Sequence, residues 1–250
     1  MRPTVLLLPL GLLLTGCPVQ EIRPPERVAP QVIRVAVPAD PALADRLEAS
    51  LAGVAGIVRV PSGDRPVDVE VVYGQPDPPA GMVATPIPSW DRSWFLELDP
   101  TARWVNDPNF RHWLAMRIDR AGMARVLFGE GAVPILSGHQ EAGRRPVSSG
   151  AMPRLQILRG SDSPSAYRIV SRLRADLLPE QVLVEPIEES RDRAVALRLV
   201  DHDPDHGGTE TDTVIPLIRE KAFLLVRTGL SGIAASPSGA LLFENARWTP

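Results

Sequence analysis

Residues 155–184 read LQILRGSDSPSAYRIVSRLRADLLPEQVLV, with two apolar runs on either side of a helical pattern. Leu155–Leu158 and Val182–Val184 predict strands, because short apolar runs bounded by polar and turn residues are typical of buried strands. Ser163 and Pro164 mark a helix start, since serine caps a first turn and proline fits its first position. The helical face is formed by Tyr167, Val170, Leu173 and Leu177. A strand, a helix and a strand in succession predict parallel neighbouring strands.

The same alternation extends in both directions from this unit. Further strands are predicted at Val32–Val37, Val67–Tyr73, Trp94–Leu98, Val214–Ile218 and Ala222–Arg227. Further helices are predicted at Pro41–Leu51 with Asp40 as N-cap, from Pro108 with Asp107 before it, and from Asp119 to Gly129. Strands alternate with helices throughout, so the predicted class is α/β.

Two segments between these elements are predicted to be loops. Pro76–Pro88 contains five prolines, which remove backbone donors and disfavour regular structure. The apolar run Ala194–Val200 leads into a polar segment, Asp201–Thr211, that is rich in aspartate, histidine and glycine. Trp90 is expected in a Pro-Ser-Trp-Asp loop.

The first residues predict export and lipidation. Arg2 is followed by the apolar run Val5–Leu14 and then by Leu14-Thr15-Gly16-Cys17, a pattern typical of a secretory signal peptide. The last four residues resemble the lipobox at which bacterial lipoproteins are lipidated on cysteine and cleaved before it. We therefore expect a signal peptide at 1–16, a lipid on Cys17, and a proline-rich tether at 17–31. The alternative is an ordinary cleaved signal peptide with an incidental cysteine.

Composition limits the classes of partner. Cys17 is the only cysteine, so a disulfide within the chain is excluded. The hydrophobic fraction of 44% suits a globular body. The net charge of −3 provides no field that favours nucleic acid, and no nucleic-acid partner is expected.

Three patches of sequence carry a resemblance to a known family. They are Trp94–Asp99, Asn106–Arg120 and Val126–Pro134, which contain the pattern of a strand, then Asp107 and Arg111, then Ile118-Asp119-Arg120, then Gly131-Ala132 and Pro134. These patches resemble family 5 of the solute-binding proteins of ABC transporters, the oligopeptide, dipeptide and nickel-binding type. The sequence departs from the family at Trp113-Leu114 and at Met116-Arg117, and it is about half as long.

The resemblance implies a fold, a function and partners. The fold would be a reduced two-lobed, type II periplasmic-binding-protein-like α/β fold, with lobe 1 at 32–104 plus 212–250 and lobe 2 at 105–211. The function would be the capture of a peptide-like or small polar solute for an ABC permease, without catalysis or cofactor. With the lipid on Cys17, the protein would be anchored to a membrane in the cell envelope and face the periplasm or the exterior.

The same resemblance places a ligand near the polar segment after residue 200. Asp201 falls nearest to the family's acidic residue, which pairs with a ligand ammonium, although Arg198 stands where the family has tryptophan. His202 and Trp90 are the other expected ligand contacts. The competing interpretation is a solvated acidic turn.

A metal site and an enzyme are the remaining alternatives. His202 and His206 lie four residues apart among aspartates, a donor set that suits Zn²⁺ or Ni²⁺, but Pro204 argues against the helix that would align them. The sequence has neither a Gly-x-Ser-x-Gly elbow nor a phosphate-binding loop with lysine.

The sequence therefore favours a solute-binding lipoprotein. The alternatives are an accessory or structural envelope lipoprotein that keeps the scaffold without binding a ligand, and a metal-dependent enzyme that uses the two histidines.

Overall fold

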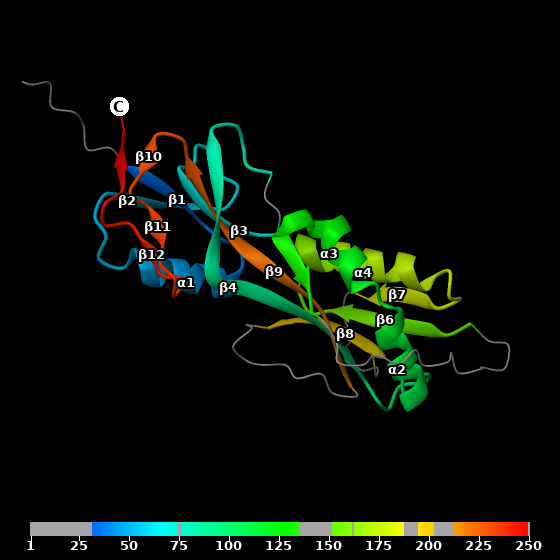
Figure 1. Cartoon of the computed structure of the whole chain (residues 1–250). Coiled ribbons are helices and arrows are strands. Elements are labelled where there is room, and N and C mark those ends of the chain that lie inside the picture. Colours follow the sequence, from blue (N-terminus) through cyan, green and yellow to red (C-terminus); the bar gives the residue numbers. More distant parts are fainter. Residues whose placement is uncertain are drawn as a thin grey trace, which may run out of the picture. The chain divides into compact units, whose positions relative to one another are not determined.

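Two long strands, β4 (Met82–Leu98) and β9 (Val214–Arg227), pair antiparallel at the centre of the sheet (Figure 1). The computed structural model describes residues 32–74, 77–135, 152–161, 163–187, 195–202 and 213–249. The central pair is flanked on one side by β3, β1 and β2, and on the other by β8, β6 and β7. The short β5 also pairs with β9.

The outer strands are parallel within each flank, whereas the pairings to β4 and β9 are antiparallel. The flanking strands are β1 (Ile33–Val37), β2 (Ile57–Pro61), β3 (Val69–Tyr73), β5 (Ala132–Pro134), β6 (Arg154–Arg159), β7 (Leu183–Ile187) and β8 (Leu197–His202). After β9 the chain forms two small antiparallel pairs: β10 (Leu230–Ser231) with β13 (Arg247–Trp248), and β11 (Ala234–Ala235) with β12 (Leu241–Leu242).

Each of the four α-helices begins at a polar side chain that accepts a hydrogen bond from the first turn, as the sequence predicted. The helices are α1 (Pro41–Leu51), α2 (Pro108–Arg117), α3 (Arg120–Phe128), η1 (Gly129–Gly131) and α4 (Pro164–Leu177). The caps of the four α-helices are Asp40, Asp107, Asp119 and Ser163. The parallel pairing of β6 and β7 around α4 is also confirmed. Among the described residues, no helix combines the length and the apolar character that crossing a membrane requires.

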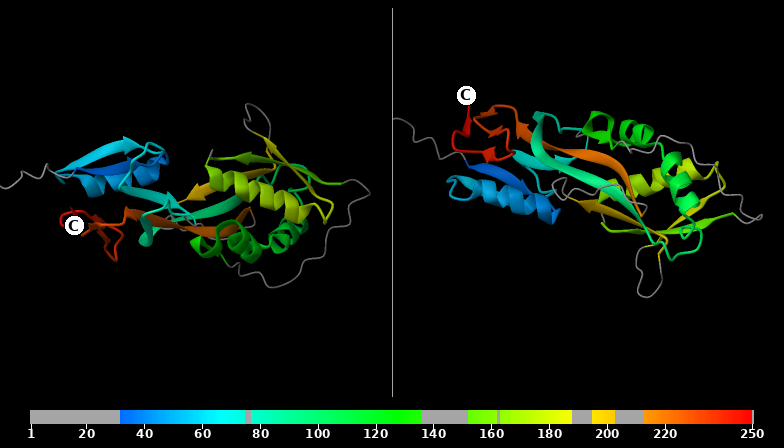
Figure 2. Two further views of the ribbon diagram at one scale, coloured as in Figure 1. Left: turned by 90° about the horizontal axis from the view of Figure 1, so that it is seen from above. Right: turned by 60° about the horizontal axis from the view of Figure 1, so that its bottom comes forward.

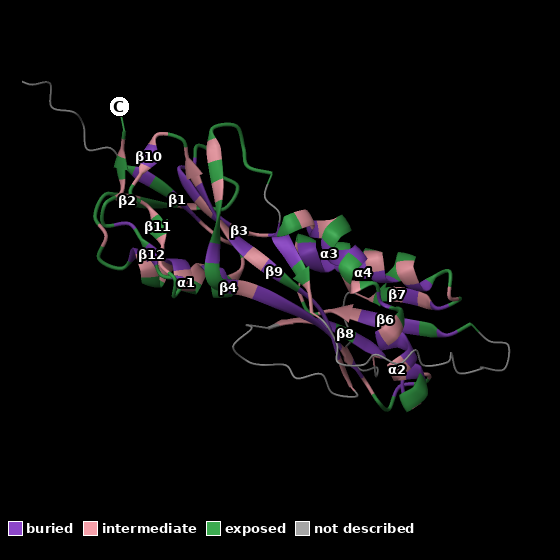
Figure 3. Ribbon diagram, in the orientation of Figure 1, coloured by how far each residue is buried: buried purple, intermediate pink, exposed green. Residues whose placement is uncertain are grey.

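The buried side chains form two clusters, and both long strands contribute to each of them (Figure 3). One cluster lies against α2, α3 and α4 and includes Trp94 and Ile218. The other lies against α1 and includes Ile87 and Leu224. Figure 2 shows β4 and β9 extending from the elements of one cluster to those of the other. The two predicted lobes, with boundaries at 104/105 and 211/212, stay a prediction.

The prediction of a loop at Pro76–Pro88 is wrong for most of its length. β4 begins at Met82 and pairs with β9 through Ile87, while β8 pairs only with the later part of β4, from Ser93 onward. The early part of β4 is therefore an edge, where proline is tolerated because no second neighbour needs its missing N–H. Trp90 consequently lies in a strand rather than in a loop.

Three other expectations also need correction. The late segment is one strand, β9, because the charged run Arg219-Glu220-Lys221 does not interrupt it. Tyr167 is 48% exposed and stacks under the Arg159 guanidinium at 3.5 Å, whereas Ile169 takes its place on the buried face of α4. The strands β2 and β5 were not predicted.

The residues that carry the family resemblance have structural roles. Asp119 caps α3 by accepting from Gly122 N at 2.8 Å, and the Arg111 guanidinium donates to the carbonyl of Val105 at 2.9 Å. Arg120 Nε donates to the carbonyl of Pro216 in β9 at 2.6 Å. The patch Asn106–Arg120 is therefore in direct contact with β9, and these side chains stabilise the fold.

The segment after β9 packs tightly over Trp90. Gly239 has a φ of +87°, and a Cβ at this residue would lie 2.5 Å from the carbonyl of Pro88 and 2.8 Å from the Trp90 ring. Both the backbone conformation and the close approach require glycine here.

We predict that Gly239→Ala lowers the free energy of unfolding by about 2 kcal/mol more than Gly53→Ala, because only the first adds an atom to a packed contact. Gly53 is the matched control, since its φ is +79° and nothing lies within 4 Å of the added Cβ. Urea denaturation of the two variants measures the difference. Equal losses would show that the contact with Trp90 does not matter.

Candidate functional site

Arg92 and Glu220 form a buried ion pair between the two central strands. They are register partners across β4 and β9, directly after an irregularity in the pairing between Ile87 and Arg92. Arg92 Nη2 and Nε donate to Glu220 Oε2 at 2.9 and 3.3 Å. The side chains are 7% and 0% exposed, so each charge depends on its protein partners instead of water.

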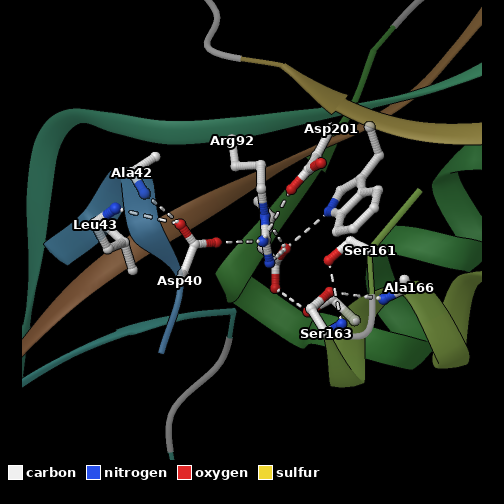
Figure 4. A network of polar contacts seen from close by, with 11 residues as sticks. Asp40, Ala42, Leu43, Arg92, Ser161, Ser163, Ala166 and Asp201 are labelled. Atoms are coloured by element: carbon white, nitrogen blue, oxygen red, sulfur yellow. Dashed lines mark hydrogen bonds and ion pairs between the residues drawn. The ribbon is translucent and has the colours of Figure 1, made fainter. Parts of the chain in front are cut away.

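Two aspartates bind the other end of the guanidinium (Figure 4). Arg92 Nη1 donates to Asp40 Oδ2 at 3.0 Å and to Asp201 Oδ2 at 3.2 Å. The second oxygen of Asp40 accepts from the N–H groups of Ala42 and Leu43 at the start of α1. The Asp40 carboxylate therefore caps α1 and also binds Arg92. Asp201, near the end of β8, binds Arg92 from another element.

Two aromatic rings and a serine complete the surroundings. The Arg92 guanidinium carbon lies 4.0 Å from the centroid of the Tyr73 ring and 4.7 Å from that of Trp94. Trp94 Nε1 donates to Glu220 Oε2 at 2.8 Å, and Ser165 Oγ donates to Glu220 Oε1 at 2.6 Å. Burial raises the pKa of Tyr73, although the positive charge of Arg92 opposes this shift. We call Arg92, Asp40, Asp201, Glu220, Tyr73 and Trp94 the Arg92 cluster.

The Arg92 cluster lies between two adjoining cavities, of about 750 and 370 Å³. Both cavities are lined by Asp40, Pro41, Tyr73, Arg92 and Ser161. The larger one is also lined by Ser62, Arg65, Glu70, Asp77, Ser163, Ser165 and Arg168, together with apolar residues. Its walls come from elements packed in both core clusters, including α1 and α4. We refer to the two cavities together as the cleft.

The cleft offers groups for non-covalent recognition. Its lining includes carboxylates, guanidinium groups, hydroxyls and the Tyr73 ring, an arrangement suited to a polar solute. Within the described residues, no three side chains of His, Cys, Asp or Glu are grouped so that they could hold a metal ion. Asp91 lines the smaller cavity, and burial raises the pKa of its carboxyl.

Of the two predicted ligand residues whose side chains the structure describes, Asp201 lines the cleft and Trp90 does not. Asp201, expected in a loop, ends strand β8 and lines the smaller cavity. Trp90 is 5% exposed and belongs to the core cluster next to α1. His202 is the last residue of β8, but its side chain lies outside the described part, as do all of His206 and Cys17. The predicted ligand contacts of Asp201, Trp90 and His202 stay predictions.

Sequence reasoning missed most of the Arg92 cluster. Asp40 was predicted only as a helix cap, and Arg92, Glu220 and Tyr73 were not singled out. One signal was available, since Glu220 is an acidic residue between two apolar runs that form a single strand. The position of Arg92 had no such signal, because it depends on the irregular pairing that precedes it in β4.

Comparisons with known proteins identify the fold. No protein-family model and no curated protein matches the sequence. The structure is similar to the ABC transporter substrate-binding protein CtaP from Listeria monocytogenes, with a TM-score of 0.56, 9% identity, and coverage of 78% of this chain and 60% of that one. It is also similar to a dipeptide-binding protein from a Pseudoalteromonas species in complex with Met-Leu, with a TM-score of 0.53, 11% identity, and coverage of 77% and 58%.

A third similar structure is NikZ from Campylobacter jejuni in complex with Ni(L-His), with a TM-score of 0.50, 12% identity, and coverage of 68% and 54%. The chain thus spans somewhat more than half the length of these proteins. The predicted fold class is confirmed: the chain has the α/β, periplasmic-binding-protein-like fold of substrate-binding proteins that serve ABC transporters.

We predict that Glu220→Gln lowers the free energy of unfolding by about 3 kcal/mol, because it removes one charge of a buried pair. Glu48→Gln is the matched control, since Glu48 and Arg59 form an ion pair whose side chains are 41% and 44% exposed. That change is expected to cost less than about 1 kcal/mol. Urea denaturation measures both; similar losses would mean that the Arg92–Glu220 pair contributes no more than a surface pair.

Proposed function

We propose that the protein is a non-catalytic, extracytoplasmic solute-binding protein that captures a peptide-like or small polar solute for an ABC permease. The observation that carries this proposal is the cleft, which adjoins buried charged side chains and has walls from both core clusters. A volume of about 750 Å³ is within the range of small-molecule sites, about 300–1,000 Å³. The fold supports the same role, because the similar structures include substrate-binding and dipeptide-binding proteins.

The cleft fits a solute with several polar groups. The larger cavity is lined by Ser62, Ser161 and Ser163 and by Arg65 and Arg168. Apolar surface from Leu43 and Leu225 lies beside them. Serine hydroxyls and arginine side chains bind carbonyl and carboxylate oxygens, the groups that a peptide or a small acid carries.

We also propose that the body is held to a membrane in the cell envelope by a lipid on Cys17. The support is the sequence of the first 17 residues, which resembles a lipoprotein export signal. A tethered receptor stays near a permease, which raises the effective concentration of captured solute at the transporter.

One observation favours the alternative of an accessory lipoprotein that has lost its ligand. Asp201, the residue expected to pair with a ligand ammonium, is bound to Arg92 of the same chain at 3.2 Å. A calorimetric and thermal-shift screen for solute binding decides between the two functions.

We predict saturable binding of at least one compound when calorimetry and thermal shift are run against small peptides, amino acids and other polar solutes. Ser161→Trp should weaken that binding by about tenfold or more, a difference of about 1.4 kcal/mol, because Ser161 lines both cavities and the indole would fill them. Ser171→Trp, at an exposed position of α4, is the control and should bind normally. Silence across the library, or equal binding by both variants, would count against a binding role of the cleft.

We predict that the wild-type chain incorporates labelled palmitate in a bacterial host and fractionates with membranes, whereas Cys17→Ser does neither. The reason is that Cys17 is the only thiol in the chain and the residue that the lipobox pattern selects. Unlabelled wild-type protein in the soluble fraction would exclude the lipid anchor.

A further inference from the structure

The groups around Arg92 are those with which proteins bind a free guanidinium ligand. Three carboxylates, Asp40, Asp201 and Glu220, accept hydrogen bonds from its Nε, Nη1 and Nη2 atoms. The rings of Tyr73 and Trp94 contribute cation–π contacts at 4.0 and 4.7 Å. Carboxylates in the guanidinium plane and aromatic faces against it are the two modes of recognition that this cation favours. We call these five residues the cage.

The cage is assembled from separate parts of the fold. Asp40 precedes α1, Tyr73 ends β3, Trp94 lies in β4, Asp201 lies in β8 and Glu220 lies in β9. The cage is also supported from outside, because Ser165 at the start of α4 donates to Glu220 and the N–H groups of α1 donate to Asp40. These supports orient the acceptors independently of Arg92. The cage is therefore held in place by several elements of the fold, unlike an ion pair between two surface side chains.

Arg92 lies in β4, the same strand that contributes Trp94 to the cage. Three additional residues of β4 separate the pairs Ile87–Ala222 and Arg92–Glu220, since five positions on β4 correspond to two on β9 (92 − 87 = 5 and 222 − 220 = 2). Ser89 within this segment has a φ of +63°. The irregular segment ends directly before Arg92 and sets the position from which its side chain reaches the three carboxylates.

We propose that the cage is a guanidinium-binding site that the protein fills with its own Arg92, so that the acidic side chains are satisfied before any solute arrives. The occupation of the cage does not depend on the proposed transport role. What the filled cage means for the class of ligand does rest on the proposed solute-binding function. Because Asp201 is already bound to Arg92, it does not pair with a ligand ammonium, and the other residues that line the cleft select the solute. The cage thus acts as an internal block against cationic groups.

Chemical rescue tests the proposal. Arg92→Ala removes the side chain beyond Cβ, and N-ethylguanidinium supplies the missing atoms. At millimolar concentration it should raise the Tm of Arg92→Ala saturably, by about 3 °C at tenfold excess over its Kd. Ethylammonium, which lacks the planar donor fork, should give a clearly smaller shift. The wild type, whose cage is full, should show no saturable rise with either compound.

Arg92→Met is the matched control, because its unbranched side chain removes the charge but fills the space that the probe needs. It should be destabilised like Arg92→Ala and should not be rescued. If Arg92→Ala does not fold alone, refolding from urea with and without N-ethylguanidinium gives the same test through the recovered circular dichroism signal. Equal recovery under both conditions, equal shifts for both probes, or rescue of Arg92→Met would overturn the proposal. Each of these outcomes leaves the solute screen of the cleft unaffected, so the two ideas fail separately.

Discussion

The buried carboxylate of Glu220 is the constraint on which the arrangement of this fold depends. A charge with no exposure to water is tolerated only where hydrogen bonds and an opposite charge replace the lost hydration. Glu220 meets that requirement with three groups from two elements: the Arg92 guanidinium and the Trp94 indole in β4, and the Ser165 hydroxyl in α4. Satisfying one side chain therefore fixes the register of β4 against β9 and the position of α4 beside them.

This constraint also determines where the cleft can lie. Arg92 is bound by Glu220 on one side and by Asp40 and Asp201 on the other, so it connects the start of α1 to the end of β8. The cavities adjoin these charged groups: residues of α1 line both of them, and residues of α4 line the larger one. The chain covers only 54–60% of the length of the similar structures. The charged groups of the Arg92 cluster beside the polar cleft are paired with one another.

Local chemistry made much of the fold predictable from sequence. The caps at Asp40 and Ser163 and the β-α-β unit around α4 depend on residues close together in the chain, and they form as predicted. Pairing across long sequence separations was not predictable. The prolines of β4 are tolerated because that part is an edge, which depends on where β8 ends, and Glu220 stays within β9 because Arg92, 128 residues away, neutralises it. Most of the Arg92 cluster was missed for the same reason: Asp201 was singled out through a local resemblance, while the position of its partner Arg92 depends on an irregular pairing far away in the sequence.

The passage of β4 and β9 through both core clusters has a mechanical consequence. A ribbon of paired strands resists bending wherever its hydrogen-bond ladder is intact, so the angle between the clusters changes by twist rather than by free rotation about a linker. The ladder is interrupted between Ile87 and Arg92, and distortion concentrates where backbone bonds are missing. Any flexing of the ribbon is consequently transmitted to the Arg92 guanidinium beside that gap and to the carboxylates that bind it.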